Sequence, residues 1–242
     1  MGRMFRKLAI VAFAGTLSYA AVTDASAEDS GSPLIHRYLE ATKAQQNALR
    51  DASMEVEINA KIPKWKKVGE AHAMRLISKL GKVTFSAIKL TGDDTVKKEV
   101  IARYLEAEQQ PHDFQAMAIA PENYKFKYKG LREVDSQHIH VFQLTPRKKA
   151  VGLFKGELWL DEATCLPVRE AGRFVKSPSF WLKKVEFVRE YQIQDGIAVP
   201  KRIESSLDTR IAGVAEIGID FSHFTKGQPQ ESEPPAALPN SQ

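Results

Sequence analysis

Alternation of apolar and polar residues dominates this chain and predicts β-strands. The clearest early case covers 54–62, where apolar residues occupy every second position. Such period-two alternation is typical of a strand with one buried face. The same pattern predicts further strands at 69–80, 82–91, 113–119, 123–132, 137–145, 151–160, 165–174, 181–194, 197–209 and 213–224. About eleven strands, separated by turn signals every ten to fifteen residues, indicate a meandering antiparallel sheet or barrel.

The stretch 152–174 predicts a β-hairpin at the centre of this arrangement. On its first strand Phe154 and Leu158 share one face, whereas Trp159 falls on the other. Gly156 lies between them and leaves a gap where another backbone or a ligand can approach. Because both faces of this strand are partly apolar, alternation alone does not tell which face is buried more deeply.

Turn chemistry supports the strand boundaries. Asp195-Gly196 is the favoured dipeptide of a tight hairpin, and Gly81 marks another turn. Pro167 cannot donate a backbone hydrogen bond to a neighbouring strand, so it marks an edge or a bulge.

Helical spacing interrupts the strands twice. Residues 33–50 carry one apolar stripe, and Ser32 with Pro33 is a typical cap and first turn. Residues 95–109 show the same spacing, with Asp93 and Asp94 at the favourable N-terminal end. A sheet this long curls rather than staying flat. We therefore expect a mainly β fold in which a curled antiparallel sheet is covered by two or three helices.

The first 27 residues predict a secretory signal peptide. A basic start precedes a short apolar core, and the small-residue site at 25–27 predicts cleavage after Ala27. The mature domain would cover 28–226, followed by a disordered tail at 227–242 that is rich in Pro, Ser, Glu and Gln. The chain carries a net charge of +5, of which about +3 would remain after cleavage. That charge is too small to indicate nucleic-acid binding.

Cys165 is the single cysteine, so an internal disulfide is excluded. We expect it to be a buried structural thiol rather than a reactive one. The basic segment 63–67 contains Trp65 and has two interpretations. It is either a solvated loop or a basic lip that contacts a membrane or an acidic partner.

Several motifs make the chain similar to a known family. They are Tyr124-x-Phe-x-Tyr128, Val141-Phe-Gln-Leu-Thr-Pro146, Gly156-Glu-Leu-Trp-Leu-Asp161 with Thr164 and Pro167-Val-Arg169, and Gly196-Ile-Ala-Val-Pro200. Over roughly 33–225 this pattern resembles the LolA-type periplasmic lipoprotein-carrier superfamily, which includes the LolB-type receptors and RseB/MucB regulators. The resemblance implies an unclosed half-barrel whose helices form a lid over an apolar cavity. LolA carriers also show a Pro-x-x-Phe-Arg motif in an early strand, which the chain lacks after Gly69, so no lid arginine is assigned.

By this resemblance the protein is a monomeric, non-enzymatic periplasmic carrier that shuttles lipoprotein acyl chains or lipids toward the outer membrane. Inner- or outer-membrane proteins are possible partners, and no cofactor is expected. The alternative is an RseB-like sensor that binds a membrane-anchored protein. The residues expected to line the cavity are Phe85, Phe126, Tyr128, Phe142, Phe154, Trp159, Trp181 and Phe187.

Candidate catalytic and metal chemistry is sparse. His138 and His140 share a strand face and could hold a metal, but no third ligand stands at a suitable spacing. Nucleophile-elbow, zinc-protease and phosphate-loop motifs are not found. These observations predict neither a metal site nor an enzyme, and a secreted hydrolase is the least supported class.

Overall fold

The computed structural model describes residues 25–110, 113–179, 181–210 and 213–227. The signal peptide predicted at 1–27 and the tail predicted at 227–242 lie almost entirely outside these residues. Within them, antiparallel strands pair into a single sheet. They are β1 (Ala52–Ile62), β2 (Lys67–Ile77), β3 (Val83–Gly92), β4 (Tyr124–Val134), β5 (Gln137–Pro146), β6 (Phe154–Asp161), β7 (Pro167–Phe174), β8 (Leu182–Gln194), β9 (Ile197–Thr209) and β10 (Gly213–Lys226).

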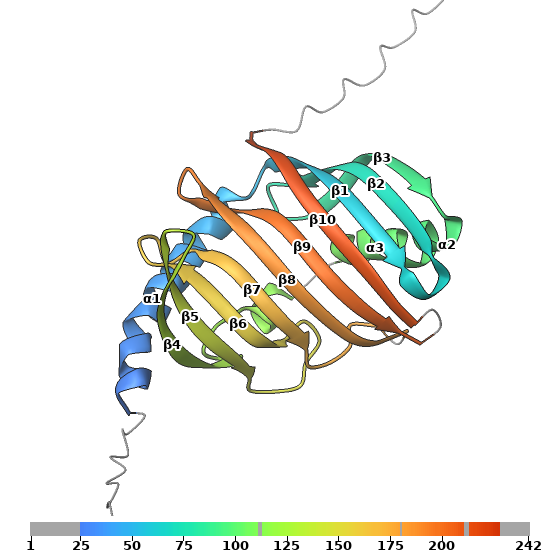
Figure 1. Cartoon of the computed structure of the whole chain (residues 1–242). Helices are drawn as coiled ribbons and strands as arrows, with labels where there is room; N and C mark the ends of the chain where they lie inside the picture. The colour runs from blue at the N-terminus through green and yellow to red at the C-terminus, as the bar shows by residue number, and fades with distance from the viewer. Residues whose placement is uncertain (1–24, 111–112, 180, 211–212, 228–242) are drawn as a thin grey trace, which may run out of the picture.

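The sheet curls without closing into a barrel (Figure 1). Its strand order is β3-β2-β1-β10-β9-β8-β7-β6-β5-β4, so that β3 and β4 form the two edges. Strands that are consecutive in the sequence pair with each other, except β3 and β4, and β1 pairs with β10, which brings the two ends of the fold together. The predicted architecture, a mainly β fold with an unclosed antiparallel sheet and a few helices, is confirmed.

The helices lie at two places along the sheet. α1 (Ala25–Ala48) runs beside β4, at one edge, and the second helical run lies beside β2 and β3 (Figure 1). This run consists of α2 (Asp94–Val96), the π-helical stretch η2 (Lys97–Ala102) and α3 (Arg103–Gln109), and is called the α2–α3 run below. The Asp93 carboxylate accepts hydrogen bonds from the backbone N–H groups of Thr95 and Val96, which confirms the predicted N-terminal end. Two short elements complete the list, the 3₁₀ turn η1 (Pro63–Trp65) and α4 (Phe114–Met117).

Two local predictions were wrong. The strand predicted at 113–119 is the helix α4, because the Asp113 carboxylate caps a helical turn by accepting from the Ala116 N–H group. The described sheet therefore has ten strands instead of eleven. The predicted start of the first helix at Ser32 and Pro33 is also wrong, since α1 begins at Ala25. The turn before the proline is held by packing, because Gly31 lies against Phe142.

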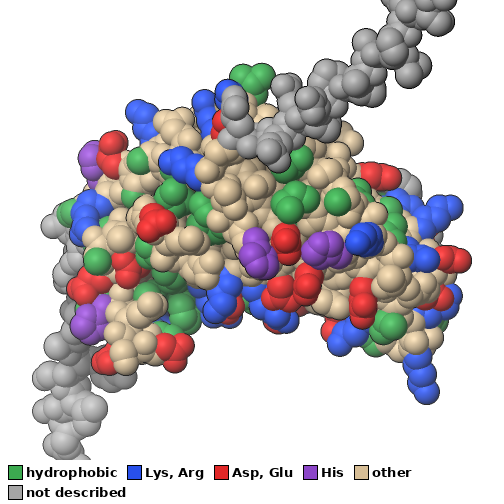
Figure 2. Space-filling view, turned by 90° about the horizontal axis from the view of Figure 1, so that it is seen from above, with side chains coloured by type: hydrophobic (Ala, Val, Ile, Leu, Met, Phe, Trp, Pro, Cys, Tyr) green, Lys and Arg blue, Asp and Glu red, His purple; other side chains and the backbone are tan. Residues whose placement is uncertain are grey.

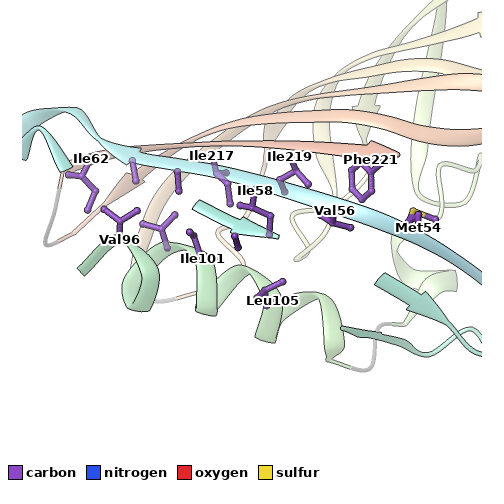
Figure 3. Packing of buried hydrophobic residues seen from close by; sticks show 14 of the residues in the cluster. Met54, Val56, Ile58, Ile62, Val96, Ile101, Leu105, Ile217, Ile219 and Phe221 are labelled. Carbon is purple, nitrogen blue, oxygen red and sulfur yellow. The ribbon is translucent and has the colours of Figure 1, made fainter. Parts of the chain in front are cut away.

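A large apolar core fixes the α2–α3 run on the sheet. Alternate residues of β1 from Ala52 to Ile62 are buried, and β10 contributes Ile217, Ile219 and Phe221. Figure 3 shows Ile58 and Ile217 of this core lying over the side chains of the helical run, among them Val96, Ile101 and Leu105. This group is called the α3 cluster below.

The hairpin of β6 and β7 explains two residues singled out in the sequence. A Cβ atom on Gly156 would collide with the backbone carbonyl of Ala171, and Gly156 pairs across the strands with Gly172. The predicted gap is thus filled by the backbone of the neighbouring strand. The register shifts where Leu160 meets Pro167, so of the two predicted possibilities, an edge or a bulge, the structure has the bulge. Asp195 and Gly196 both have positive φ, as a tight hairpin turn of the favoured type requires.

Candidate functional site

A row of cross-strand neighbours shows that both helical elements cover the same face of the sheet. Strand pairing joins, in order, Leu90, Ala71, Ile58, Ile219, Ile203, Arg189, Glu170, Leu158, Phe142 and Tyr128. Paired residues point to the same side of a sheet. The row runs from the α3 cluster to the residues beneath α1, and is apolar or aromatic except at its centre. We call this side the helix-covered face and the other the open face.

An aromatic cluster lies between α1 and the sheet and is called the α1 cluster. Five residues that the sequence predicted as cavity lining meet here, namely Phe126, Tyr128, Phe142, Phe154 and Phe187. The ring centroids of Tyr128 and Phe142 are 5.1 Å apart, and those of Phe154 and Phe187 are 5.0 Å apart. Tyr124, which is fully buried, links the groups because its hydroxyl accepts a hydrogen bond from the Phe154 backbone N–H. Burial first of all raises the pKa of Tyr124 to about 12.

The other three predicted lining residues lie elsewhere. Phe85 packs against the α3 cluster. Trp159 lies on the open face, where its Nε1 donates to Glu157 and the Arg169 guanidinium stacks on its ring at 4.8 Å. Trp181 precedes β8, with the Arg103 guanidinium 5.0 Å from the centre of its ring.

An ion pair interrupts the apolar row between the two clusters. The Arg189 guanidinium lies 3.3 Å from the Glu170 carboxylate, and the side-chain exposures are 37% and 9%, so the carboxylate is the buried partner. Burial opposes the charged form of Arg189, but Glu170 outweighs this effect and the pKa of the guanidinium is raised. Burial and, after it, the same carboxylate raise the pKa of Tyr38 and of Tyr191.

A second ion pair lies on the side of the α2–α3 run. Arg75 of β2 lies 3.4 Å from Glu108 of α3 and so connects strand to helix. Buried polar atoms without a hydrogen-bond partner among the described residues include Arg75 Nε and the Tyr104 hydroxyl. The pKa of Tyr104 is raised, above all by burial. Arg189, Glu170 and Tyr191 thus form a polar band between the two apolar clusters, whereas Arg75, Tyr104 and Glu108 lie beside the α3 cluster.

Sequence reasoning missed this band, although a signal for part of it was present. On β8 the buried phase reads Val185, Phe187, Arg189 and Tyr191 at every second position. A charged residue in the apolar phase of a strand indicates a buried partner. The partner itself, Glu170, follows only from the register of β7 and β8.

α1 is held over its cluster by apolar contacts and a few polar ones. Tyr38 is buried in the cluster, and Leu34, Ile35 and Leu39 are half-buried around it. Gln45 exchanges two hydrogen bonds with the backbone of Ala198 in β9, at 2.8 and 3.1 Å. Arg37 donates to the Ala163 carbonyl in the turn between β6 and β7. Among the described α1 side chains, Arg37 and Gln45 make the direct hydrogen bonds to the rest of the fold.

The open face carries two shallow hollows with a different chemistry. Each has a volume of about 690 Å³. The first lies across β1, β2, β8, β9 and β10 and is lined by Lys61, Arg202 and glutamates such as Glu70 and Glu204. Its charged lining is unsuited to an acyl chain. The aromatic face beneath α1 is therefore the better candidate for an apolar ligand.

The histidine pair and the cysteine have structural partners. The Tyr128 hydroxyl lies 2.9 Å from His140 Nδ1, and His138 lies 3.1 Å from the Glu162 carboxylate. Within the described ranges, His, Cys, Asp and Glu side chains do not gather into a group of three that could hold a metal. Cys165 is buried as predicted, and burial raises the pKa of its thiol. In the part of the chain that the structure covers, a helix long and apolar enough to cross a bilayer is not found.

Comparisons with known proteins give low similarities. No family model and no curated protein matches the chain. Among solved structures, the chain is similar to the LolA superfamily protein NE2245 from Nitrosomonas europaea, with 13% identity, a TM-score of 0.46 and coverage of 81% of this chain and 94% of that one.

Two further solved structures are similar at the same low level. One is a putative outer membrane lipoprotein-sorting protein domain from Vibrio parahaemolyticus, with 13% identity, a TM-score of 0.44 and coverage of 83% and 94%. The other is the Pseudomonas aeruginosa MucA/MucB complex, with 12% identity, a TM-score of 0.28 and coverage of 79% and 99%. These TM-scores are too low to indicate a function, which is therefore inferred from the side chains described above.

Proposed function

We propose that this protein is an exported, periplasmic carrier that binds acyl chains of lipoproteins or lipids beneath α1 and shuttles them toward the outer membrane. The observation that supports this most is the α1 cluster, in which aromatic side chains from five strands meet under a single helix at the edge of the sheet. Its rim residues Phe126, Tyr128 and Phe174 remain partly accessible.

The burial free energies of an acyl chain and of α1 allow the chain to replace the helix on the aromatic cluster. Burying an acyl chain contributes ~0.8 kcal/mol per methylene, so ten methylenes contribute about 8 kcal/mol. The apolar side of α1 covers the cluster with Tyr38 and three half-buried aliphatic residues. Their burial contributes roughly 5 kcal/mol. A chain of ten or more methylenes can therefore displace α1 from the aromatic side chains, and no covalent step is needed.

The polar attachments of α1 suit such a movement. Gln45 bonds to Ala198 near the C-terminal end of the helix, while the aromatic contact made by Gly31 lies near the other end. We expect the N-terminal half of α1 to move away from the sheet while the Gln45 contact persists. Loading and release then follow mass action, with the ligand and the helix competing for one surface.

Native mass spectrometry of protein purified from its own periplasm without detergent tests the proposal. We expect a bound lipid or acylated peptide, and rebinding of an acyl probe after delipidation. Phe126→Ala should weaken probe binding about tenfold through the loss of apolar contact. The matched control is Phe85→Ala, since Phe85 is also a partly buried phenylalanine on the helix-covered face but packs against the α3 cluster.

Two results would contradict this carrier function. A clean apo mass with no uptake of an acyl probe would favour the protein-partner function of the RseB type. Equal weakening by Phe126→Ala and Phe85→Ala would mean that uptake does not take place beneath α1.

A further inference from the structure

One end of the sheet combines basic and exposed apolar side chains. Because neighbouring strands are antiparallel, the β1–β2 turn and the β5–β6 loop emerge at the same end. Both lie along the lower side of the sheet in Figure 1. The turn contains η1 and the loop covers 147–153, and we call this end the basic end.

The β1–β2 turn presents a tryptophan between lysines. Trp65 is 39% exposed, and it is flanked by the exposed side chains of Lys64 and Lys66. Lys67 lies 5.9 Å from the centre of the Trp65 ring and pairs with Asp93. Lys66 has positive φ and closes the turn, so the projecting shape of this segment is fixed by its backbone.

The β5–β6 loop repeats this combination. Arg147, Lys148 and Lys149 are followed by Val151, which is 44% exposed. The loop packs on α4, because a Cβ atom on Gly152 would collide with Met117.

α4 adds an aromatic residue beside this loop. Phe114, in its first turn, is 62% exposed. Arg147 Nε donates to the Pro121 carbonyl, which ties the loop to the segment that leaves α4. The acidic side chains close by are Asp113, which caps α4, and Glu122.

The large exposed hydrophobic residues of the described chain include two aromatic ones. These are Trp65 and Phe114, and both belong to the basic end. The β1–β2 turn and the β5–β6 loop are called the two points below. Their lysines are Lys64, Lys66, Lys148 and Lys149, and these have no acidic partner among the described residues. The opposite end also exposes an aliphatic residue between lysines, since Leu80 is 93% exposed beside Lys79 and Lys82, but none of the aromatic residues among the large exposed hydrophobics described lies there. Figure 2 views the molecule from that end and shows acidic side chains interspersed with basic ones and histidines.

We propose that the basic end docks on an anionic lipid surface through these two points. Basic side chains next to exposed aromatic and aliphatic ones match the chemistry of the membrane interface, where cations meet anionic headgroups and apolar side chains enter the acyl boundary. The nearest strands of the two points, β1 and β6, are five strand spacings apart, which is about 25 Å for a flat sheet. Two separated contacts fix the orientation of the protein on the surface, which a single point cannot do.

This inference goes beyond acyl binding and does not depend on it. Protection of an edge strand by lysines, the ordinary explanation of such charges, applies to β4 and not to loops that connect interior strands. Solubility alone accounts for the lysines but not for Trp65 between them.

Co-sedimentation with vesicles tests the docking. The exported protein is mixed with vesicles of phosphatidylcholine alone, or of phosphatidylcholine and phosphatidylglycerol in equal parts. We expect at least tenfold stronger binding to the anionic vesicles, and a blue shift of tryptophan emission that Trp65→Ala abolishes. Each basic residue at the surface contributes about fivefold to partitioning. The charge reversals Lys64→Glu with Lys66→Glu, and Lys148→Glu with Lys149→Glu, should therefore each weaken binding at least tenfold.

The control carries the same change of net charge at the opposite end. Lys82→Glu with Lys226→Glu alters two exposed lysines there and should leave vesicle binding within about twofold of the parent. If the control lost as much vesicle binding as the charge reversals at the basic end, net charge alone would explain the binding and the proposal would be overturned. Absence of binding to anionic vesicles would also overturn the proposal. This holds even if an acidic protein is found to bind the basic end. Circular dichroism of each variant establishes that it is folded.

Discussion

The ion pair between Arg189 and Glu170 gives an asymmetric prediction, because its two members differ in exposure. The carboxylate is 9% exposed and the guanidinium 37% exposed. Arg189→Met leaves a charged carboxylate buried among apolar and tyrosine side chains, which costs about 3 kcal/mol of unfolding free energy. Glu170→Gln leaves a guanidinium that is more exposed than the carboxylate and keeps an amide oxygen beside it as an acceptor, so the cost is smaller, about 1 kcal/mol. The double variant should cost about 2 kcal/mol, at least 1 kcal/mol less than the sum.

Urea denaturation followed by circular dichroism measures these differences. The control is Arg202→Met, which removes a guanidinium only 2.6 Å from the Asp220 carboxylate but on the open face, with side-chain exposures of 43% and 42%. We expect this variant to change stability less than either single change in the buried pair, since burial and not distance decides the cost. Equal costs for Arg189→Met and Glu170→Gln, or strict additivity in the double variant, would refute the reasoning.

Three further predictions address α1, the buried tyrosine and the β6–β7 hairpin. Gly31→Leu should loosen α1 and speed uptake of an acyl probe, because even its Cβ would lie 3.2 Å from Phe142; unchanged uptake in stopped-flow measurements contradicts this. Because the pKa of Tyr124 is raised to about 12, the folded state keeps its proton while the unfolded chain ionises near pH 10, so stability should fall as pH rises from 10 to 12. Tyr124→Phe should reduce that fall by roughly 2 kcal/mol in denaturation curves at each pH, and an identical slope would argue against it. Gly156→Ala should lower the melting temperature by at least about 10 °C, since the new Cβ meets the Ala171 carbonyl, whereas an unchanged melting temperature would exclude the close approach.

Local patterns in the sequence were sufficient to predict most of the sheet. Alternation depends on residues within one strand, so the buried side of β1 and the division of the β6 residues between two faces were predicted, but not which face of β6 is covered. Turn chemistry is equally local, and the Asp195-Gly196 hairpin needed no tertiary information. Of the two errors, the strand predicted at 113–119 overlooked the local cap by Asp113, and the other arose from a tertiary contact. α1 extends past Pro33 because Gly31 packs on Phe142, a residue more than a hundred positions away.

The candidate site was harder to predict because it depends on register. Phe126, Phe142, Phe154 and Phe187 come from four different strands, and alternation gives the face of each without naming its neighbours. Trp159 is likewise a large aromatic residue in a predicted strand, yet it lies on the open face. The strand order of the sheet, in which β8 follows β7 and β6, is what brings the phenylalanines together.

The position of the Arg189–Glu170 pair limits how far the apolar surface beneath α1 extends along the sheet. The pattern of aromatic residues in the sequence does not indicate this limit. The pair lies in the same cross-strand row as Leu158 on one side and Ile203 on the other, so it stands between the α1 cluster and the α3 cluster. An acyl chain that extends from one cluster toward the other must pass this pair, and placing methylenes against a charged group forfeits the hydration of that group without supplying a hydrogen bond. Under the proposed carrier function, the apolar surface that a ligand can use beneath α1 therefore ends at β7 and β8. Because its length along the row is set by strand spacing, the sheet itself restricts the length of chain that α1 can cover.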